Sequence, residues 1–283
     1  MWRDALGQPH PRAAADARIA SLVPSVTELL FALGLGDRLV ARTGFCIHPE
    51  PQVRAVAKVG GTKDVQLDKL RALAPTHVVV NIDENRRETV DEIRGFVPNV
   101  IVTHPCAPRD NLELYRLLGG IFDREAEAET LCTRLEQALA RLEARAWPTR
   151  RVLYAIWQDP WMTVSRDTYI SRMLALIGWQ TWPDAQDADD AGAAPQACVD
   201  GDCARPNAPG QRYPSFRWSE ALVRELDLVL LSTEPYRFTE DHADALERQL
   251  GLPVLLVDGE MVSWYGSRAI DGIAYLETLA RQA

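Results

Sequence analysis

A long stretch without Gly or Pro, from Glu125 to Ala146, constrains the possible folds of this chain more than any other part of the sequence. Its apolar residues recur at three- and four-residue spacing, which places one apolar stripe on a helix. These apolar positions are Leu131, Leu135, Ala138 and Leu142. Trp147 and Pro148 end the helix, because the residue before proline disfavours helical backbone angles. At about 1.5 Å per residue the helix is roughly 33 Å long, about the width of a small domain.

Runs that alternate between strand-like and helix-like patterns lie on both sides of this helix. Examples of the strand-like runs are Arg18–Val23, His77–Val80 and Arg151–Ile156. Strands that alternate with helices at this spacing favour right-handed crossovers and parallel sheets. The sequence therefore predicts an α/β protein with two Rossmann-like lobes joined by one long backbone helix. An ordinary long surface helix within a single domain is the alternative.

The predicted organisation follows from the position of the long helix. We expect a disordered leader over 1–17, an N-terminal α/β lobe over 18–123, a linking helix over 124–147 and a C-terminal α/β lobe over 148–283. Within the second lobe, residues 183–211 are rich in Ala, Asp, Gly and Pro, and they predict a mobile insertion. In the first lobe, Ser25 and Glu28 match the S-x-x-E pattern of a capping box.

Composition excludes several classes of protein. The net charge of −9 argues against nucleic acid or an anionic membrane surface as the main partner. No apolar run reaches the roughly 20 residues that a membrane-spanning helix needs. Five cysteines do not suggest a disulfide framework, although Cys198 and Cys203 are close enough in sequence to pair. The first residues lack the apolar segment of a signal peptide, so as written the sequence predicts a cytoplasmic location.

In parallel α/β sheets, ligands bind outside the carboxyl ends of the strands. This rule selects polar and aromatic residues in the loops that follow the predicted strands. In the first lobe these candidates are Pro24, Ser25, Phe45, His48, Asp83 and Glu84. In the second lobe they are Trp157, Trp161, Met162, Glu234, Tyr236, Trp264, Tyr265 and Arg268. If the two lobes face each other, these loops line one cleft.

Aromatic residues are concentrated in the candidate loops of the second lobe. Trp157, Trp161, Trp264 and their aromatic neighbours lie in turns, where a hydrophobic core does not need them. A large, flat and partly apolar ligand suits such a cluster, although each ring could instead pack over an edge of the sheet. Arg268 could neutralise a carboxylate or phosphate on that ligand, or form a surface salt bridge.

Two short motifs contain metal-ligating residue types. Cys46-x-His48 and His104-x-Cys106 both follow predicted strands, but nothing in the sequence brings them together, and the metal remains unknown. The sequence has no phosphate-binding loop, dinucleotide fingerprint or nucleophile elbow. No carboxylate pair stands out as an acid and a base either. This pattern favours binding over catalysis, without a required cofactor.

The opening segment RIASLVPSVTELLFALGLGDRLVART, followed by KVGG and LDKLRALAPTHVVV, resembles a known family. It is similar to the helical-backbone, class III, periplasmic substrate-binding proteins of ABC importers, which include cobalamin and ferric-siderophore receptors. The resemblance runs from Arg18 over nearly the whole chain. It implies two lobes that move little about a rigid helix, and a ligand such as cobalamin or a ferric chelate between them.

The resemblance also implies roles for particular residues. Aromatic side chains of both lobes hold the corrin in cobalamin receptors, and the matching positions here lie at Phe45–His48, Trp161–Met162, Tyr213 and Trp264–Arg268. The family docks onto an ABC permease through one acidic residue on each lobe, for which Asp68 and Glu220 are the nearest matches. We therefore expect a monomer whose partners are a small molecule and an ABC permease.

Two alternatives stay open at this point. A receptor for a bare transition metal would use His and Cys ligands, which are scarce in the second lobe. A small enzyme that inserts metal into a tetrapyrrole would need a base in the cleft, and His48 is the candidate.

Overall fold

A computed structural model describes residues 1–183 and 212–282 of the chain. The chain divides into two compact units. Unit 1 consists of Met1–Pro105, Arg109–Ala138 and Tyr265–Ile270, and unit 2 consists of Cys106–Pro108, Leu139–Trp264 and Asp271–Ala283. The predicted insertion over 183–211, with Cys198 and Cys203, lies outside the described residues except for Pro183.

The long helix α5 spans Glu125–Glu143 and carries the chain from unit 1 to unit 2. The division between the units falls within this helix, between Ala138 and Leu139. Its predicted apolar stripe is buried along the whole length, since all four side chains are at most 5% exposed. The prediction of two α/β lobes joined by one backbone helix is confirmed.

Unit 1 contains a five-stranded parallel sheet with the order β5-β4-β3-β6-β7. The strands are β3 (Ile19–Ser21), β4 (Leu39–Arg42), β5 (Ala57–Lys58), β6 (His77–Asn81) and β7 (Asn99–Thr103). The strand runs are almost wholly apolar because helices cover both faces of a parallel sheet. The chain adds β4 and β5 on one side of β3 and then β6 and β7 on the other, so the order reverses between β3 and β6.

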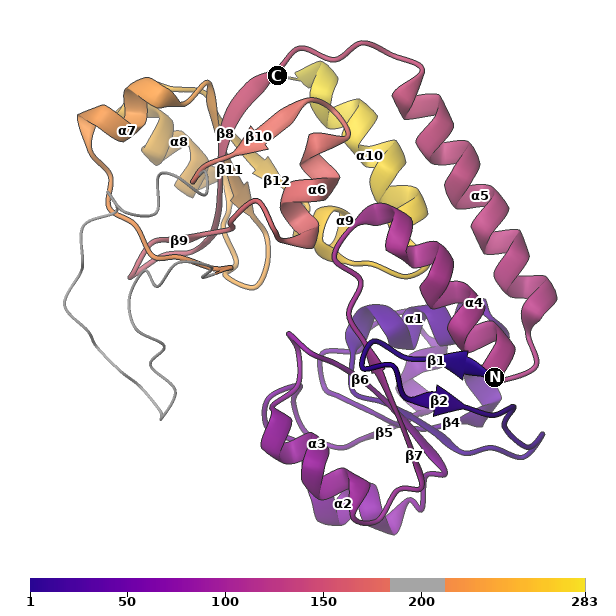
Figure 1. Cartoon of the computed structure of the whole chain (residues 1–283). Helices are drawn as coiled ribbons and strands as arrows, with labels where there is room; N and C mark the ends of the chain where they lie inside the picture. Colours follow the sequence, from indigo (N-terminus) through magenta and orange to yellow (C-terminus); the bar gives the residue numbers. More distant parts are fainter. Residues whose placement is uncertain (184–211, 283) are drawn as a thin grey trace. The chain divides into compact units, whose positions relative to one another are not determined.

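Alternate residues of these strands face different helices. Ala20, Val78 and Val80 pack with α2 (Leu67–Ala72) and α3 (Arg87–Arg94). On the opposite face, Thr27 of α1 (Pro24–Ala32) donates a 2.9 Å hydrogen bond to the Ser21 hydroxyl. Figure 1 shows α1 on the other side of this sheet from α2 and α3. The helix α4 (Asn111–Ile121) completes the helices that lie within unit 1.

The N-terminal residues are not the disordered leader that the sequence predicts. Trp2–Arg3 (β1) pairs antiparallel with Pro9–His10 (β2), and Asp4 in the turn is 7% exposed. The Asp4 carboxylate accepts a hydrogen bond from the Val102 amide at 3.1 Å. The Trp2 indole lies so close to Gly120 that a Cβ atom there would meet it at 2.0 Å. These partners lie about 100 residues along the chain, so no local pattern reveals them.

The capping box predicted at Ser25 and Glu28 is wrong. Helix α1 begins at Pro24, its N-cap is Val23, and no side chain caps it. Proline suits the first helical position because its missing amide hydrogen has no partner there in any helix. Glu28 instead pairs with Arg268, which lies 240 residues away.

Unit 2 contains a second sheet with the strand order β10-β8-β11-β12. Its parallel strands are β8 (Arg150–Trp157), β10 (Trp179–Thr181), β11 (Leu228–Ser232) and β12 (Val254–Val257), and the short strand β9 (Met162–Thr163) pairs antiparallel with β8. The order reverses between β8 and β11. Both sheets therefore follow one scheme, in which β3, β4, β6 and β7 correspond to β8, β10, β11 and β12.

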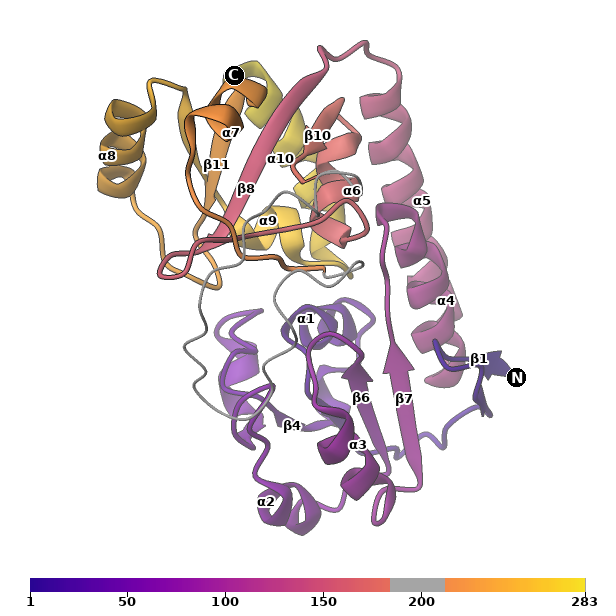
Figure 2. The same ribbon diagram turned by 60° about the vertical axis from the view of Figure 1, so that its left-hand side comes forward.

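Helices cover both faces of the second sheet as well. Leu153, Val229 and Leu231 pack with α7 (Glu220–Glu225) and α8 (Glu240–Leu250). Figure 2 shows α7 and α8 on one side of β8 and β11, and α6 (Tyr169–Ala175) and α10 (Arg268–Gln282) on the other. The short helix α9 (Gly259–Ser263) packs against α6. In the described part of the chain, no helix combines the length and the apolar character that crossing a membrane requires.

Candidate functional site

Ligands of doubly wound sheets bind at the carboxyl ends of the strands, where the strand order reverses. In unit 1 this point lies between β3 and β6, and the segments there are Leu22–Ser25, whose last two residues begin α1, and Ile82–Arg86. In unit 2 it lies between β8 and β11, and the loops are Gln158–Trp161 and Thr233–Thr239. Seven of the fifteen ligand-binding residues proposed from the sequence lie in these four segments: Pro24, Ser25, Asp83, Glu84, Trp161, Glu234 and Tyr236.

Two asparagine side chains hold the loops of unit 1 in place. Asn85 donates hydrogen bonds to the carbonyl oxygens of Leu22 at 3.2 Å and Thr62 at 3.0 Å. Its side-chain oxygen accepts a hydrogen bond from the Asn81 amide at 2.9 Å. Asn81 in turn accepts from the Asp83 amide at 2.8 Å. Neither asparagine was among the site residues proposed from the sequence, although asparagine at the end of a strand is a signal of such a loop.

The acidic residues of this loop are half-buried, and a histidine lies beside them. The His104 imidazole, which follows β7, is 3.4 Å from the Asp83 carboxylate, and Lys63 donates to the Asp83 carbonyl oxygen at 2.6 Å. Glu84 is also half-buried. The structure thus adds His104 to Asp83 and Glu84 as a polar group at the carboxyl edge of this sheet.

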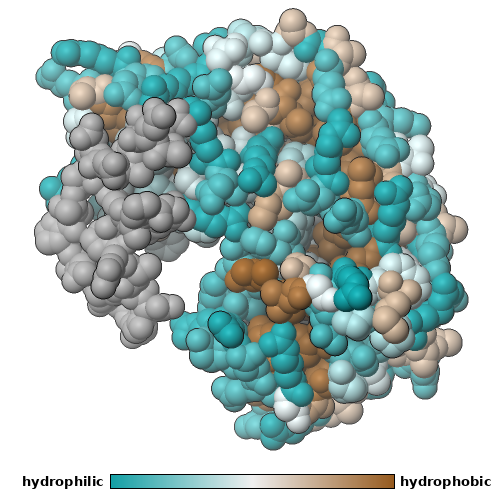
Figure 3. Space-filling model, viewed as in Figure 1, coloured by the Kyte–Doolittle hydropathy of each residue, from teal (hydrophilic) through white to brown (hydrophobic). Residues whose placement is uncertain are grey.

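Large apolar side chains are exposed in the same region of unit 1. Phe45 is 62% exposed, Ile47 44% and Ile82 45%, and all three follow β4 or β6. The Phe45 ring lies over Gly61, where a Cβ atom would come within 3.3 Å of it. Figure 3 shows brown, hydrophobic side chains at the surface of this part of the protein. Exposed apolar patches of this kind mark binding surfaces.

The other residues proposed in unit 1 are more enclosed. Ser25 is 4% exposed, and Pro24, the first residue of α1, is half-buried. His48 is also half-buried and lies between Ile47 and Pro49. The Cys46 thiol is fully buried beside the hydroxyls of Thr27 and Thr43, at 3.0 and 3.1 Å, so it points away from the surface on which Phe45 lies.

The segment Tyr265–Ile270 belongs to unit 1, although its sequence position suggests the second lobe. Tyr265 is 7% exposed, and burial raises the pKa of its hydroxyl well above the ordinary value. The Gly266 amide donates to the Asn111 side chain at 2.6 Å, and the Gly266 carbonyl oxygen accepts from the Tyr115 hydroxyl at 2.8 Å. This segment is therefore packed into unit 1.

Arg268 makes the salt bridge that was the alternative to a ligand contact. Its guanidinium donates two hydrogen bonds to the Glu28 carboxylate, at 2.9 and 2.8 Å. The two side chains are only 12% and 20% exposed. A paired guanidinium of this kind is not available to balance the charge of a ligand unless Glu28 moves.

Most of the aromatic residues of unit 2 pack on one another. Trp161 stacks on Phe238 with a centroid distance of 5.8 Å and an interplanar angle of 8°, and it meets Trp218 edge-on at 5.6 Å. Trp157 meets Tyr236 edge-on at 5.4 Å and remains 40% exposed. Phe238 and Trp218 were not among the site residues proposed from the sequence. Trp157 is thus the candidate aromatic side chain of unit 2 most open to solvent.

Glu234 follows β11 and holds a neighbouring loop. Its carboxylate accepts hydrogen bonds from the Ser263 hydroxyl at 2.9 Å and from the Trp264 indole at 2.8 Å. Burial raises the pKa of Glu234, and the two hydrogen bonds oppose that shift. Trp264 is only 8% exposed. These contacts indicate that Glu234 positions Trp264.

The remaining candidates lie at the edge of unit 2 or on its helices. Met162 begins β9 and is half-buried, and so is Tyr213. The proposed docking residues lie on corresponding helices, Asp68 in the first turn of α2 and Glu220 at the start of α7. Asp68 is exposed, and the Glu220 side chain is 90% exposed and within 3.1 Å of Arg224.

Neither Cys-His motif forms a metal site in the described residues. Over 1–183 and 212–282, no three His, Cys, Asp or Glu side chains are arranged to hold a metal ion. The Cys46 thiol points into the interior, as described above, and Arg172 donates to the Cys106 carbonyl oxygen at 3.2 Å. At the carboxyl ends of the strands, unit 1 exposes Phe45, Ile47 and Ile82 beside polar groups, and unit 2 exposes Trp157.

Comparisons with known proteins add information on the family and the fold. Residues 19–197 match the family model described as periplasmic binding protein. A vitamin B12-binding protein of Photorhabdus laumondii is 26% identical over 171 residues, which are 60% of this chain and 62% of that protein. An uncharacterized ABC transporter substrate-binding lipoprotein of Bacillus subtilis is 27% identical over 170 residues, covering 56% and 53% of the two chains.

Solved structures show the same fold over almost the whole chain. The periplasmic vitamin B12 binding protein of Vibrio cholerae superposes with a TM-score of 0.70 at 18% identity, over 97% of this chain and 98% of that one. A periplasmic heme binding protein of Pseudomonas aeruginosa gives a TM-score of 0.71 at 19% identity, over 94% and 93%.

Proposed function

Because this chain belongs to the periplasmic binding protein family, we propose that it binds a corrinoid or an iron chelate and delivers it to an ABC transporter. The family consists of binding proteins, and we infer that this member also catalyses no reaction. Curated relatives are named as vitamin B12-binding proteins, and solved structures of the same fold as vitamin B12 or heme binders. The chain spans 62% of the length of the first of these relatives, so the ligand named for that relative is a proposal for this chain.

The observation that carries this proposal is the exposure of large apolar side chains at the carboxyl edges of both sheets. Phe45, Ile47 and Ile82 in unit 1, and Trp157 in unit 2, are all at least 40% exposed. Leaving such side chains in water costs free energy, which a flat apolar ligand recovers on whichever unit it covers them. Asp83, Glu84 and His104 beside them supply the polar contacts that orient a ligand.

Substitution of Phe45 by alanine tests the proposal. We expect the affinity for cobalamin, hemin or a ferric siderophore, whichever binds the wild-type protein, to fall by about 10-fold, since an aromatic contact of this size is worth about 1.4 kcal/mol. Quenching of tryptophan fluorescence measures the affinity. The free energy of unfolding should stay nearly unchanged, because Phe45 is mostly exposed in the absence of ligand.

A matched control is available at Leu6. This side chain is 60% exposed, like Phe45, but it lies in the turn between β1 and β2. Leu6→Ala should leave the ligand affinity unaltered. Equal affinities of the wild-type and Phe45→Ala proteins would remove this loop from the site. Failure of all three ligand classes to quench the wild-type protein would overturn the proposed ligand class itself.

We further propose that Asp68 and Glu220 contact the permease. Each is an exposed acidic residue in the first turn of a helix, and the two helices precede corresponding strands, β6 and β11. The double substitution Asp68→Lys/Glu220→Lys should abolish co-purification with the permease and leave the ligand affinity as it is. Retained co-purification would refute the docking role.

We propose a monomer as the working form, with one ligand bound per chain, and sedimentation tests this. Delivery to an importer requires the protein on the outer side of the membrane, so the docking role and the cytoplasmic location expected from the sequence exclude each other, and cell fractionation decides between them.

A further inference from the structure

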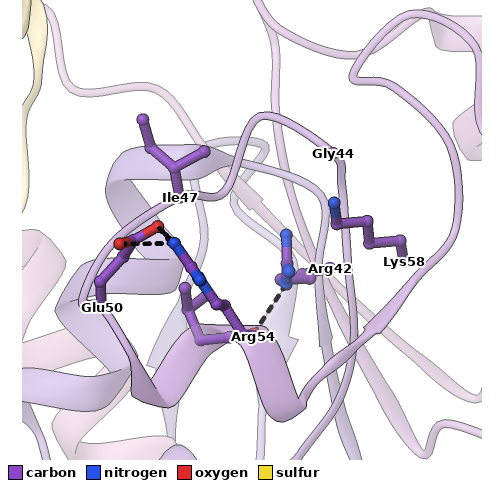
Figure 4. Close-up of a pocket in the computed structure, with 7 residues that line it drawn as sticks. Arg42, Gly44, Ile47, Glu50, Arg54 and Lys58 are labelled. Carbon is purple, nitrogen blue, oxygen red and sulfur yellow. Dashed lines mark hydrogen bonds and ion pairs between the residues drawn. The ribbon is translucent and has the colours of Figure 1, made fainter.

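A pocket of about 400 Å³ opens at one edge of the sheet of unit 1 (Figure 4). It lies where β4 and β5 end, beneath the loop that follows β4. The lining residues are Arg42, Gly44, Ile47, Glu50, Val53, Arg54 and Lys58. Three of these side chains are cationic and one is anionic, which is unusual in a chain with a net charge of −9.

Arg42 is the last residue of β4 and is only 3% exposed. Its Nε donates to the Val53 carbonyl oxygen at 2.8 Å. Its Nη1 donates to the carbonyl oxygens of Thr43 and Cys46, at 3.1 and 2.9 Å. These hydrogen bonds hold the guanidinium in place, but their acceptors are neutral carbonyl groups. The Nη2 atom makes no hydrogen bond to any residue that the structure describes.

A buried cation without a counterion is costly, because the interior solvates charge poorly. Within residues 1–183 and 212–282, no carboxylate pairs with Arg42. Glu50 is the one acidic residue of the pocket lining, and both of its oxygens accept hydrogen bonds from Arg54 at 2.9 Å. The Arg54 charge is thus compensated, and the Arg42 charge is not.

Lys58 places a second cation at the same pocket, and it has no carboxylate partner among the described residues. It is the last residue of β5 and the register partner of Arg42, so both side chains leave the sheet on the same face. In Figure 4 the ends of Arg42 and Lys58 point the same way, toward the loop at Gly44. If Arg42 served only to hold the loop through its hydrogen bonds to backbone carbonyl groups, a second cation beside it would add nothing to that role.

We propose that this pocket binds an anionic group of the phosphate or carboxylate type between Arg42 and Lys58. The planar guanidinium presents its Nη2 hydrogens to an oxyanion, and the flexible ammonium balances the remaining charge. The anion is either free in solution or part of a larger molecule that reaches the pocket. The proposal does not depend on the ligand of the protein being a corrinoid or an iron chelate.

Protection of lysines from acylation tests this site directly. The chain contains only three lysines, Lys58, Lys63 and Lys69, so mass spectrometry resolves each of them. Inorganic phosphate at millimolar concentration should slow the acylation of Lys58 several-fold and leave that of Lys69 unchanged, with chloride at equal ionic strength as the control. Hemin, whose porphyrin carries carboxylates, provides the second arm. Protection by phosphate identifies a free anion, protection by hemin alone identifies a group on a larger ligand, and protection by neither overturns the proposal.

Two substitutions shift phosphate binding in opposite directions. Lys58→Ala should weaken phosphate binding by about 10-fold, the effect of losing one charge-assisted contact, whereas Lys69→Ala on α2 should not. Glu50→Gln should strengthen phosphate binding, because it releases Arg54 from its partner and removes the negative charge from the lining. A misfolded variant cannot bind more tightly, so a gain with Glu50→Gln is specific. An unaltered or weaker affinity of that variant would contradict the site, and calorimetry measures all three variants.

Discussion

Glu28→Ala is expected to lower the free energy of unfolding by about 3 kcal/mol, the typical effect of removing one partner from an enclosed ion pair. Glu28 and Arg268 are joined by two hydrogen bonds of 2.8 and 2.9 Å, and their side chains are 20% and 12% exposed. Without Glu28, the guanidinium loses its carboxylate in a site that water reaches poorly. Urea unfolding followed by circular dichroism measures the change.

The pair Arg116 and Glu129 provides the matched control. It has the same two-bond geometry, at 2.7 and 3.0 Å, but both side chains are about half exposed. Glu129→Ala should leave the unfolding curve nearly unchanged, because water compensates exposed charges. The double variant Glu28→Ala/Arg268→Ala should be destabilised by less than the sum of its single substitutions. Additive effects would mean that the two residues act separately.

Trp264→Ala is expected to lower the free energy of unfolding by about 3–5 kcal/mol, the range for truncating a buried tryptophan. Trp264 is 8% exposed, and its indole donates a 2.8 Å hydrogen bond to Glu234. The substitution leaves a cavity and removes the indole donor, so that the half-buried Glu234 carboxylate keeps the hydrogen bond from Ser263 and loses the one from Trp264. Thermal unfolding and urea unfolding both measure this change in the free energy of unfolding.

Two further variants, Trp264→Phe and Trp157→Ala, separate the contribution of packing from that of the hydrogen bond to Glu234 and from the effect of removing an exposed tryptophan. The phenylalanine variant keeps much of the packing and loses the hydrogen bond to Glu234, so it should lie between the wild-type protein and Trp264→Ala. Trp157 is 40% exposed, so its truncation should cost less than about 1 kcal/mol. If Trp264→Ala proved as stable as the wild-type protein, the buried position of this side chain would be wrong.

These expectations alter how binding experiments on the aromatic loops should be interpreted. A loss of affinity in Trp264→Ala could follow from a displaced loop, because this side chain is a structural contact within unit 2. A loss of affinity in Phe45→Ala or Trp157→Ala reports on the ligand more directly, since both side chains are exposed. Exposure, rather than residue type, therefore selects the substitutions that test the site.

The long helix and the alternating strands could be predicted because their signals are local. The spacing of Leu131, Leu135 and Leu142 defines one face of α5, and all three side chains are buried. The carboxyl-end rule likewise needs only the order of the elements, so the loops of the candidate site were found from the sequence. Which residues in those loops face solvent could not be found in this way. Trp157 ends β8 and Trp264 follows α9, and the sequence proposed both for the site, yet one is 40% and the other 8% exposed.

The sequence by itself determined the long helix α5, the order of most strands and helices of the two lobes, and the edge of each sheet where a ligand can bind, because these depend on patterns within short stretches of the chain. It did not reveal β1, β2 or β10. Only the tertiary structure decided the partners of Asp4, Glu28 and Arg42. Asp4 reaches Val102 and Glu28 reaches Arg268, while Arg42 donates to backbone carbonyl groups and pairs with no carboxylate among the residues that the structure describes. The physical reason is that burial and charge pairing depend on residues brought together by the fold, up to 240 positions apart.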